Sequence, residues 1–180
     1  MHSIPARGLT RVVAPAFEPL TLAETKLYLR VDHSDDDASI GRMIQAAREA
    51  AEFYLRRSLV TQDWLLERDD GIAEAVALSR GPVQSVLSVQ RISSSGTVTE
   101  TLATALYRLN AARSHLLLDT VVNDRVRVTY RTGYGAAEDV PAALRQGLLA
   151  HVAALYEGVS TAGLTEHCIN IYAPYRELSL

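Results

Sequence analysis

The chain has 180 residues, of which 48% are hydrophobic and 22% are charged. These proportions are typical of a folded protein and exclude disorder throughout. The formal net charge of −3 argues against a protein whose main task is to grip nucleic acid, because such domains are basic. A single cysteine, Cys168, excludes an internal disulfide and a cysteine-only metal cluster. No apolar run approaches the about 18 residues of a membrane span, and we expect neither a membrane segment nor a signal peptide.

Residues 1–19 are predicted to form an extended N-terminal arm. Pro5, Pro15 and Pro19 each remove a backbone donor and disfavour helix at the preceding residue. Such an arm is either loose or held by a neighbouring element.

Two helices are predicted next, over residues 21–31 and 36–58. Thr21 and Glu24 have the spacing of a capping box at the start of the first helix. The second helix has one apolar stripe at helical spacing. Its other face is charged and is expected to be exposed, with weak ion pairs between residues four apart. That face carries Arg42, Gln45, Arg48, Glu49, Glu52 and Arg56.

The middle of the chain, residues 60–132, is predicted to be an antiparallel β portion with hairpins. Residues 125–131 alternate between apolar and polar side chains, which is typical of a half-buried strand. Val126, Val128 and Tyr130 are expected to face the core. Arginines then line the outer side of this strand. The expected strands are residues 61–68, 83–92, 97–102, 107–109, 115–118 and 125–131.

A third helix is predicted over residues 140–157, with Pro141 in its first turn. The tail, residues 159–180, carries apolar side chains that need burial. We interpret it as a docking segment that becomes ordered on binding; the alternative is that it folds back on its own core. The fold class is therefore α+β: a small helical bundle, with the long second helix on the C-terminal helix, an inserted antiparallel β portion and extended arms at both ends.

No recognisable catalytic or metal site is present in the sequence. No two histidines have metal-binding helix spacing, and the acidic stretch at Asp32 lacks the glycine and glutamate of a calcium loop. Glycine-rich phosphate loops and nucleophile elbows are also missing. We expect no catalytic residue, no cofactor and no metal, so the chain is predicted not to be an enzyme; a small hydrolase is the weakest alternative.

The order and spacing of several segments resemble one protein family over about residues 18–176. The chain is similar to the head–tail connector proteins (adaptor or head-completion proteins) of long-tailed phages, prophages and gene transfer agents. The segments that carry this resemblance are residues 18–31, the helix 40–59, Gln62 and Trp64, residues 126–135, residues 140–146, and Pro174 to Arg176.

The resemblance implies a structural role in the neck of a virion or phage-like particle, made in the host bacterial cytoplasm. Such proteins form a ring, commonly of twelve copies, below the portal protein. The ring extends the DNA channel, through which DNA passes without specific binding, and is a platform for the next head-completion (stopper) or tail protein. On this model, residues 1–19 are an arm, 20–158 the connector domain and 159–180 the docking tail.

The resemblance also implies site residues, because family members use the C-terminal segment to grip the portal. The portal-docking candidates are Leu164, Ile169, Ile171, Tyr172, Pro174, Tyr175 and Arg176. Candidates for the interface between ring subunits are Arg42, Arg48, Glu52, Arg56, Arg125, Arg127 and Arg131. An alternative function is a DNA-binding packaging accessory protein, with Arg125, Arg127 and Arg131 as its phosphate contacts.

Overall fold

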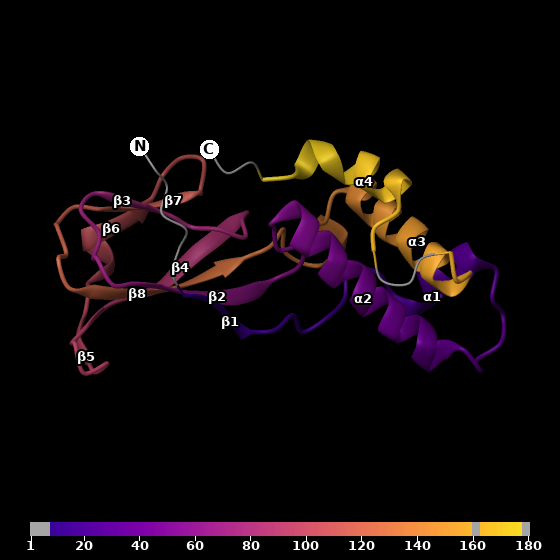
Figure 1. Ribbon diagram of the computed structural model, residues 1–180, viewed down its shortest axis with the longest axis horizontal. Helices are drawn as coiled ribbons and strands as arrows, with labels where there is room; N and C mark the ends of the chain where they lie inside the picture. The colour runs from indigo at the N-terminus through magenta and orange to yellow at the C-terminus, as the bar shows by residue number, and fades with distance from the viewer. Residues whose placement is uncertain (1–7, 160–162, 178–180) are drawn as a thin grey trace. The chain divides into compact units, whose positions relative to one another are not determined.

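The computed structural model describes residues 8–159 and 163–177, and its contacts divide the chain into two compact units. The β unit contains residues 8–15 and 61–133 of this described part, and the helical unit contains residues 16–60, 134–159 and 163–177. Figure 1 shows both units in one ribbon. Each unit therefore contains segments that are far apart in the sequence.

The β unit has one five-stranded and one three-stranded sheet, and neighbouring strands in both are antiparallel. The larger sheet has the order β1 (Leu9–Val13), β2 (Gln62–Arg68), β8 (Arg125–Thr132), β4 (Val83–Ile92) and β5 (Val98–Thr101). The smaller sheet has the order β3 (Ala75–Ala77), β7 (His115–Leu118) and β6 (Tyr107–Leu109). The predicted strands and hairpins of the middle of the chain are confirmed.

One apolar core joins the two sheets. Val126, Val128 and Tyr130 of β8 are fully buried, as their alternation predicts, and they share a cluster with Val76 of β3 and Leu116 of β7. The unit is therefore a two-layer β structure, and the polar positions of β8 lie on the outer face of the larger sheet.

The helical unit contains α1 (Leu22–Leu29), α2 (Asp37–Leu55), α3 (Ala142–Tyr156) and α4 (Glu166–Tyr172). The capping box at the start of α1 is present, with the Glu24 N–H donating to Thr21 Oγ1 over 3.1 Å. The apolar stripe of α2 packs against α3, so the α+β class and the predicted packing of these helices are confirmed. The buried residues of this contact include Ile40, Ile44, Ala47, Ala51, Leu55, Leu144, Leu148 and Val152. Short 3₁₀ turns cover Thr104–Leu106, Ala137–Asp139 and Ala173–Tyr175.

Part of the predicted N-terminal arm is a sheet strand. β1 pairs with β2 from Leu9↔Leu66 to Val13↔Asp63, with an irregularity after Arg11. Leu9 packs against the core of the β unit, and this burial holds the segment in the sheet. Residues 1–7 of the predicted arm lie outside the described residues.

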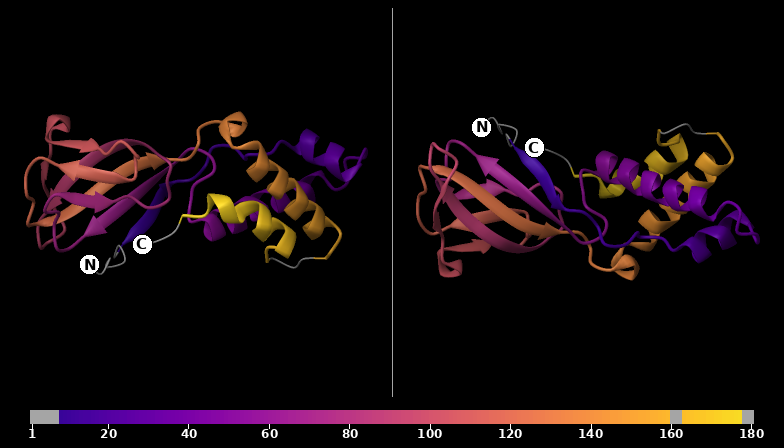
Figure 2. Two further views of the ribbon diagram at one scale, coloured as in Figure 1. Left: turned by 90° about the horizontal axis from the view of Figure 1, so that it is seen from above. Right: turned by 90° about the horizontal axis from the view of Figure 1, so that it is seen from below.

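The described part of the C-terminal tail is not extended: residues 166–172 form α4, a fourth helix that the sequence analysis did not predict. Cys168 and Tyr172 are four residues apart, so they share one helix face, and both are fully buried. The Thr165 hydroxyl caps the helix by accepting from the Cys168 N–H. Figure 2 shows α4 beside α3. The tail thus folds back on its own core; residues 160–162 and 178–180 lie outside the described residues.

Candidate assembly surfaces

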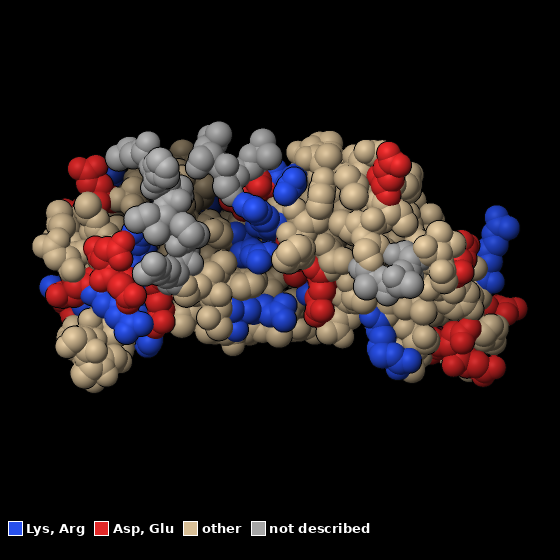
Figure 3. Space-filling model, viewed as in Figure 1, with Lys and Arg blue, Asp and Glu red and all other residues tan. Residues whose placement is uncertain are grey.

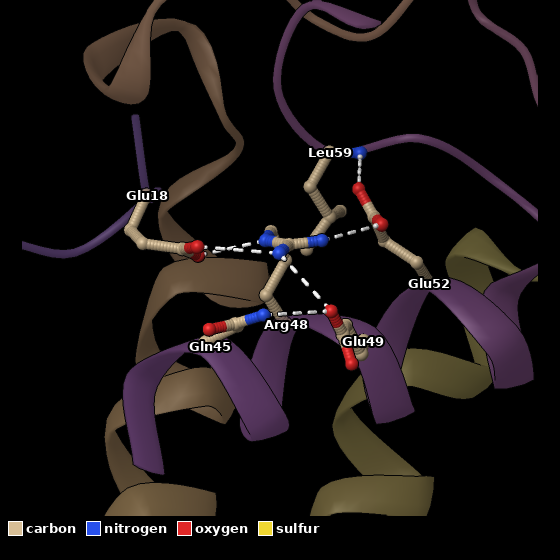
Figure 4. A network of polar contacts seen from close by, with 6 residues as sticks. All are labelled: Glu18, Gln45, Arg48, Glu49, Glu52 and Leu59. Atoms are coloured by element: carbon tan, nitrogen blue, oxygen red, sulfur yellow. Dashed lines mark hydrogen bonds and ion pairs between the residues drawn. The ribbon is translucent and has the colours of Figure 1, made fainter. Parts of the chain in front are cut away.

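In the helical unit, an ion-pair cluster surrounds the buried Arg48 of α2 (Figure 4). The Arg48 side chain is 3% exposed. Its Nε and Nη2 donate to the Glu18 carboxylate over 2.7 and 3.2 Å, and its Nη1 donates to Glu52 Oε2 over 3.1 Å. The other oxygen of Glu52 accepts from the backbone N–H of Leu59 over 2.8 Å. Burial alone would lower the pKa of Arg48, but Glu18 and Glu52 more than offset it, so the pKa is raised.

The expectation that Arg48 and Glu52 lie on an exposed helix face is therefore wrong. The segment that contains Glu18 covers this face of α2, which helical periodicity within α2 cannot reveal. The charges of Arg48 and Glu52 are used inside the subunit, where they fix Glu18 before α1 and Leu59 after α2. Of the interface candidates on α2, Arg42 and Arg56 are the exposed ones.

On the outer face of the larger sheet, the arginines of β8 are paired with carboxylates of the neighbouring strand or loop. Arg131 donates to Asp63 over 2.8 and 3.0 Å, and Arg127 donates to Glu67 over 2.9 and 2.6 Å. These residues are direct cross-strand partners in the register of β2 and β8. The hydrogen bonds that Arg131 donates to Asp63 raise the pKa of Arg131.

Arg125 completes this pattern, with its Nε 2.9 Å from Asp69 Oδ1. The predicted arginine-lined face is therefore present, but each arginine named for it has an acidic partner. A phosphate would have to displace that partner before it could bind.

Oppositely charged side chains also pair at the end of the β unit that carries β5. Arg91 lies 2.5 Å from Asp124 and 3.0 Å from Glu100. Figure 3 shows acidic and basic side chains next to one another on this part of the drawn face. The surface there carries both positive and negative charges, which does not favour the binding of a polyanion such as DNA.

The structure divides the predicted portal-docking residues between core and surface. Tyr172 is fully buried, with its ring centroid 6.4 Å from that of Tyr54. Arg176 is exposed and its guanidinium lies 5.0 Å from the centroid of the same Tyr54 ring. The backbone N–H of Glu177 donates to the carbonyl of Leu55 over 2.9 Å. Of the remaining candidates, Pro174 is exposed, and partly buried are Leu164, Ile169, Ile171 and Tyr175.

Sequence reasoning missed an apolar surface on α1. Leu27 is 82% exposed, and a surface depression of about 420 Å³ beside it is lined by Leu22, Ala23, Lys26, Leu27 and Val31. The signal was present in the sequence, because the apolar residues of α1 do not keep to a single stripe. Elsewhere in the helical unit, Phe53 is 79% and Val159 74% exposed.

Within residues 8–159 and 163–177, no group of three or more His, Cys, Asp or Glu side chains is placed to hold a metal ion. The helices of this part of the chain are all too short or too polar to cross a membrane. Cys168 lies in the core of the helical unit, with its Sγ 3.7 Å from the carbonyl oxygen of Gly147.

Buried His151 of α3 makes the stability of the helical unit depend on pH. Burial lowers its pKa below the ordinary value of 6.5, although the polar backbone of Gly163 acts in the opposite direction by favouring the protonated ring. Below pH 6.5 the His151 imidazole is protonated in the unfolded chain but stays neutral to a lower pH in the folded chain. Stability is therefore full above about pH 6.5 and falls as the pH drops, by at most about 1.4 kcal/mol per pH unit for this one group.

We expect His151→Gln to lose less stability than the wild type between pH 7 and pH 5, as measured by urea unfolding at each pH. His167→Gln is the matched control, because His167 is exposed on α4. Equal pH dependence of the His151→Gln and His167→Gln variants would contradict the assignment.

Comparisons with known proteins agree with this arrangement. The family model of the phage gp6-like head-tail connector protein matches residues 19–108. A chain from the neck of an empty gene transfer agent (GTA) particle has the same fold, with a TM-score of 0.80 at 20% sequence identity over 97% of both chains. Chains from the native GTA virion and from its neck each align with a TM-score of 0.79 at 20% identity, over 96% and 97% of both chains respectively.

A comparison with curated proteins gave no match. The family model covers half of the sequence and spans α1, α2 and the strands from β2 to β5. The chain belongs to the phage gp6-like head-tail connector family.

Proposed function

We propose that this chain is a structural connector in the neck of a phage or phage-like particle, where it forms a ring under the portal. The observation that carries the proposal is the connector-family match over residues 19–108. In such a position the ring extends the DNA channel and offers a platform for the next head-completion or tail protein.

The ring is supported by the symmetry of the similar structures, which are particle necks computed with C6 and C12 symmetry. A closed ring needs two different patches on each subunit, one for each neighbour. The exposed apolar residues Leu27 of α1 and Phe53 of α2 are candidates for such patches. We take twelve copies as the working stoichiometry.

The pairing of the charged groups supports a role without catalysis. Several carboxylates and arginines of the described residues are bound to one another: Glu18 and Glu52 to Arg48, Asp63 to Arg131, and Glu67 to Arg127. Groups held in this way stabilise a shape rather than act on a substrate.

We further propose that the tail contacts the portal protein as a folded element of the helical unit. Tyr172 then anchors the tail to α3, and the portal meets the side chains left exposed, Pro174 and Arg176, together with the accessible parts of Leu164, Ile169, Ile171 and Tyr175. This arrangement differs from a tail that becomes ordered only on binding.

The proposal is tested by mixing the purified chain with portal rings and examining the product by negative-stain electron microscopy and native mass spectrometry. We expect a ring of this chain on one face of the portal. A chain that stays monomeric and does not associate with the portal would contradict the proposal.

A second experiment separates the connector from a DNA-binding accessory protein. Arg125, Arg127 and Arg131 are already paired with carboxylates. We therefore expect no salt-dependent binding of duplex DNA, either by the wild type or by the variant in which all three are replaced by alanine. Fluorescence anisotropy against salt concentration measures this, since each phosphate contact adds about 0.9 to the slope of log affinity on log salt. A steep slope that the triple variant abolishes would favour the accessory protein.

A further inference from the structure

Helix α1 has apolar side chains on the face that packs against the helical unit and also on its exposed face. Leu22 and Leu29 pack against the core of the helical unit, whereas Leu27 and Tyr28 are 82% and 42% exposed. The depression of about 420 Å³ on this helix has walls made by aliphatic side chains and the Lys26 stem. Exposed apolar side chains that lie together on a surface often mark a site of contact with another protein. The outer side of α1 therefore lacks a cover within the described residues of this subunit.

The second prominent apolar residue of the unit, Phe53, lies far from this depression. The Lys26 ammonium is bound to Asp37 over 2.5 Å, which fixes α1 beside the first turn of α2. Phe53 lies in the last turn of α2, about 24 Å further along the helix at 1.5 Å per residue. Figure 1 shows α1 and the C-terminal end of α2 at opposite ends of the helical unit. Phe53 cannot fill the α1 depression of its own copy.

The charges beside the two apolar features are of opposite sign. The segment that follows α1 contains one exposed arginine, Arg30, and the exposed carboxylates of Asp32 and Asp35. Arg56 and Arg57 directly follow the last turn of α2, next to Phe53. One feature is thus a depression lined by Lys26, whose charge is paired with Asp37, with acidic side chains in the segment that follows. The other is an aromatic side chain with two arginines directly after it in the chain.

We propose that Phe53 of one copy inserts into the α1 depression of the next copy, with Arg56 and Arg57 facing Asp32 and Asp35. This inference rests on the proposed ring function and names the contact that builds the ring. The two features differ and lie at separate places on one subunit, so their contact is heterologous and repeats from copy to copy, as ring closure requires. A large aromatic side chain in an apolar pocket is also the type of residue that dominates binding energy at interfaces.

The test uses Leu27→Asp and Phe53→Asp, each of which damages one side of the contact and leaves the other side intact. We expect each variant alone to remain monomeric in native mass spectrometry, while the wild type forms rings. Mixed in equal amounts, the two variants are expected to form a dimer and no larger species, because Phe53 of Leu27→Asp still fits the intact depression of Phe53→Asp. Val159→Asp is the control: it adds the same charge at a comparably exposed apolar site and is expected to form rings.

Rings formed by either variant alone, or a mixture that stays monomeric, would overturn this contact while leaving the ring function intact. A wild type that forms no ring, with or without portal, would overturn the proposed function as well. Leu27 and Phe53 are both about four-fifths exposed, so the unit should fold without them, which circular dichroism checks. Leu27→Ser and Phe53→Ser form a milder second pair with the same expected pattern, should an aspartate variant unfold.

Discussion

Replacing Arg48 with methionine is expected to lower the free energy of unfolding of the helical unit by about 3 kcal/mol. Methionine keeps most of the volume and the aliphatic stem but leaves the carboxylates of Glu18 and Glu52 without their cation. The Glu52 side chain is 9% exposed, so water compensates little for the lost cation. The Glu18 side chain is 30% exposed and is partly solvated. The effect should therefore lie near the lower end of the range for breaking a buried ion pair. Urea unfolding followed by far-ultraviolet circular dichroism measures it.

Arg42→Met is the matched control, because Arg42 is an arginine of the same helix that is exposed to solvent. Surface substitutions of this kind change stability by about 0.5 kcal/mol or less. Equal losses in the Arg48→Met and Arg42→Met variants would mean that the cluster around Arg48 does not hold the unit together. The control also separates the loss of the buried ion pairs from any change in helix propensity, since both variants exchange the same two residue types.

The features that the sequence predicted are those set by neighbours along the chain. The Thr21 and Glu24 capping box needs a spacing of three, and the alternation of Val126, Val128 and Tyr130 needs only the pleat of a strand. The stripe of α2 likewise follows from helical periodicity. The family resemblance rested on the order of such segments, and the connector family is confirmed.

The features that the sequence could not give depend on distant partners. Arg48 is buried because Glu18, thirty residues earlier, lies over it. Arg127 and Arg131 of β8 are paired with carboxylates of β2, which precede them by 60 and 68 residues in the chain. Periodicity within one element carries no information about such partners, so charged side chains were assigned to surfaces.

The fold of the tail could not be predicted for a related reason. Its helix α4 has 7 residues, too short to show a periodic stripe, and its burial depends on a gap in α3. That gap is at Gly147: a Cβ there would lie 2.4 Å from Cε1 of Tyr172 and 3.2 Å from Cγ2 of Ile171. Glycine in the middle of α3 therefore lets α4 approach closely. A glycine inside a predicted helix is the one sequence signal that pointed to this contact.

Gly147→Ala is accordingly expected to destabilise the helical unit by about 1–3 kcal/mol, because the added methyl group overlaps a fully buried ring. Alanine is by itself a better helix former than glycine by about 1 kcal/mol. A lower free energy of unfolding would therefore show that the packing against Tyr172 dominates, and a higher one would show that helix propensity dominates. Gly41→Ala is the control: it lies within α2, and an added Cβ there would have no neighbour within 4 Å, so this variant should gain stability. Urea unfolding measures both, and amide exchange should quicken over residues 166–172 in Gly147→Ala alone. If both variants gained stability, α4 would not be seated on Gly147, and the tail would be free to leave α3 when it meets the portal.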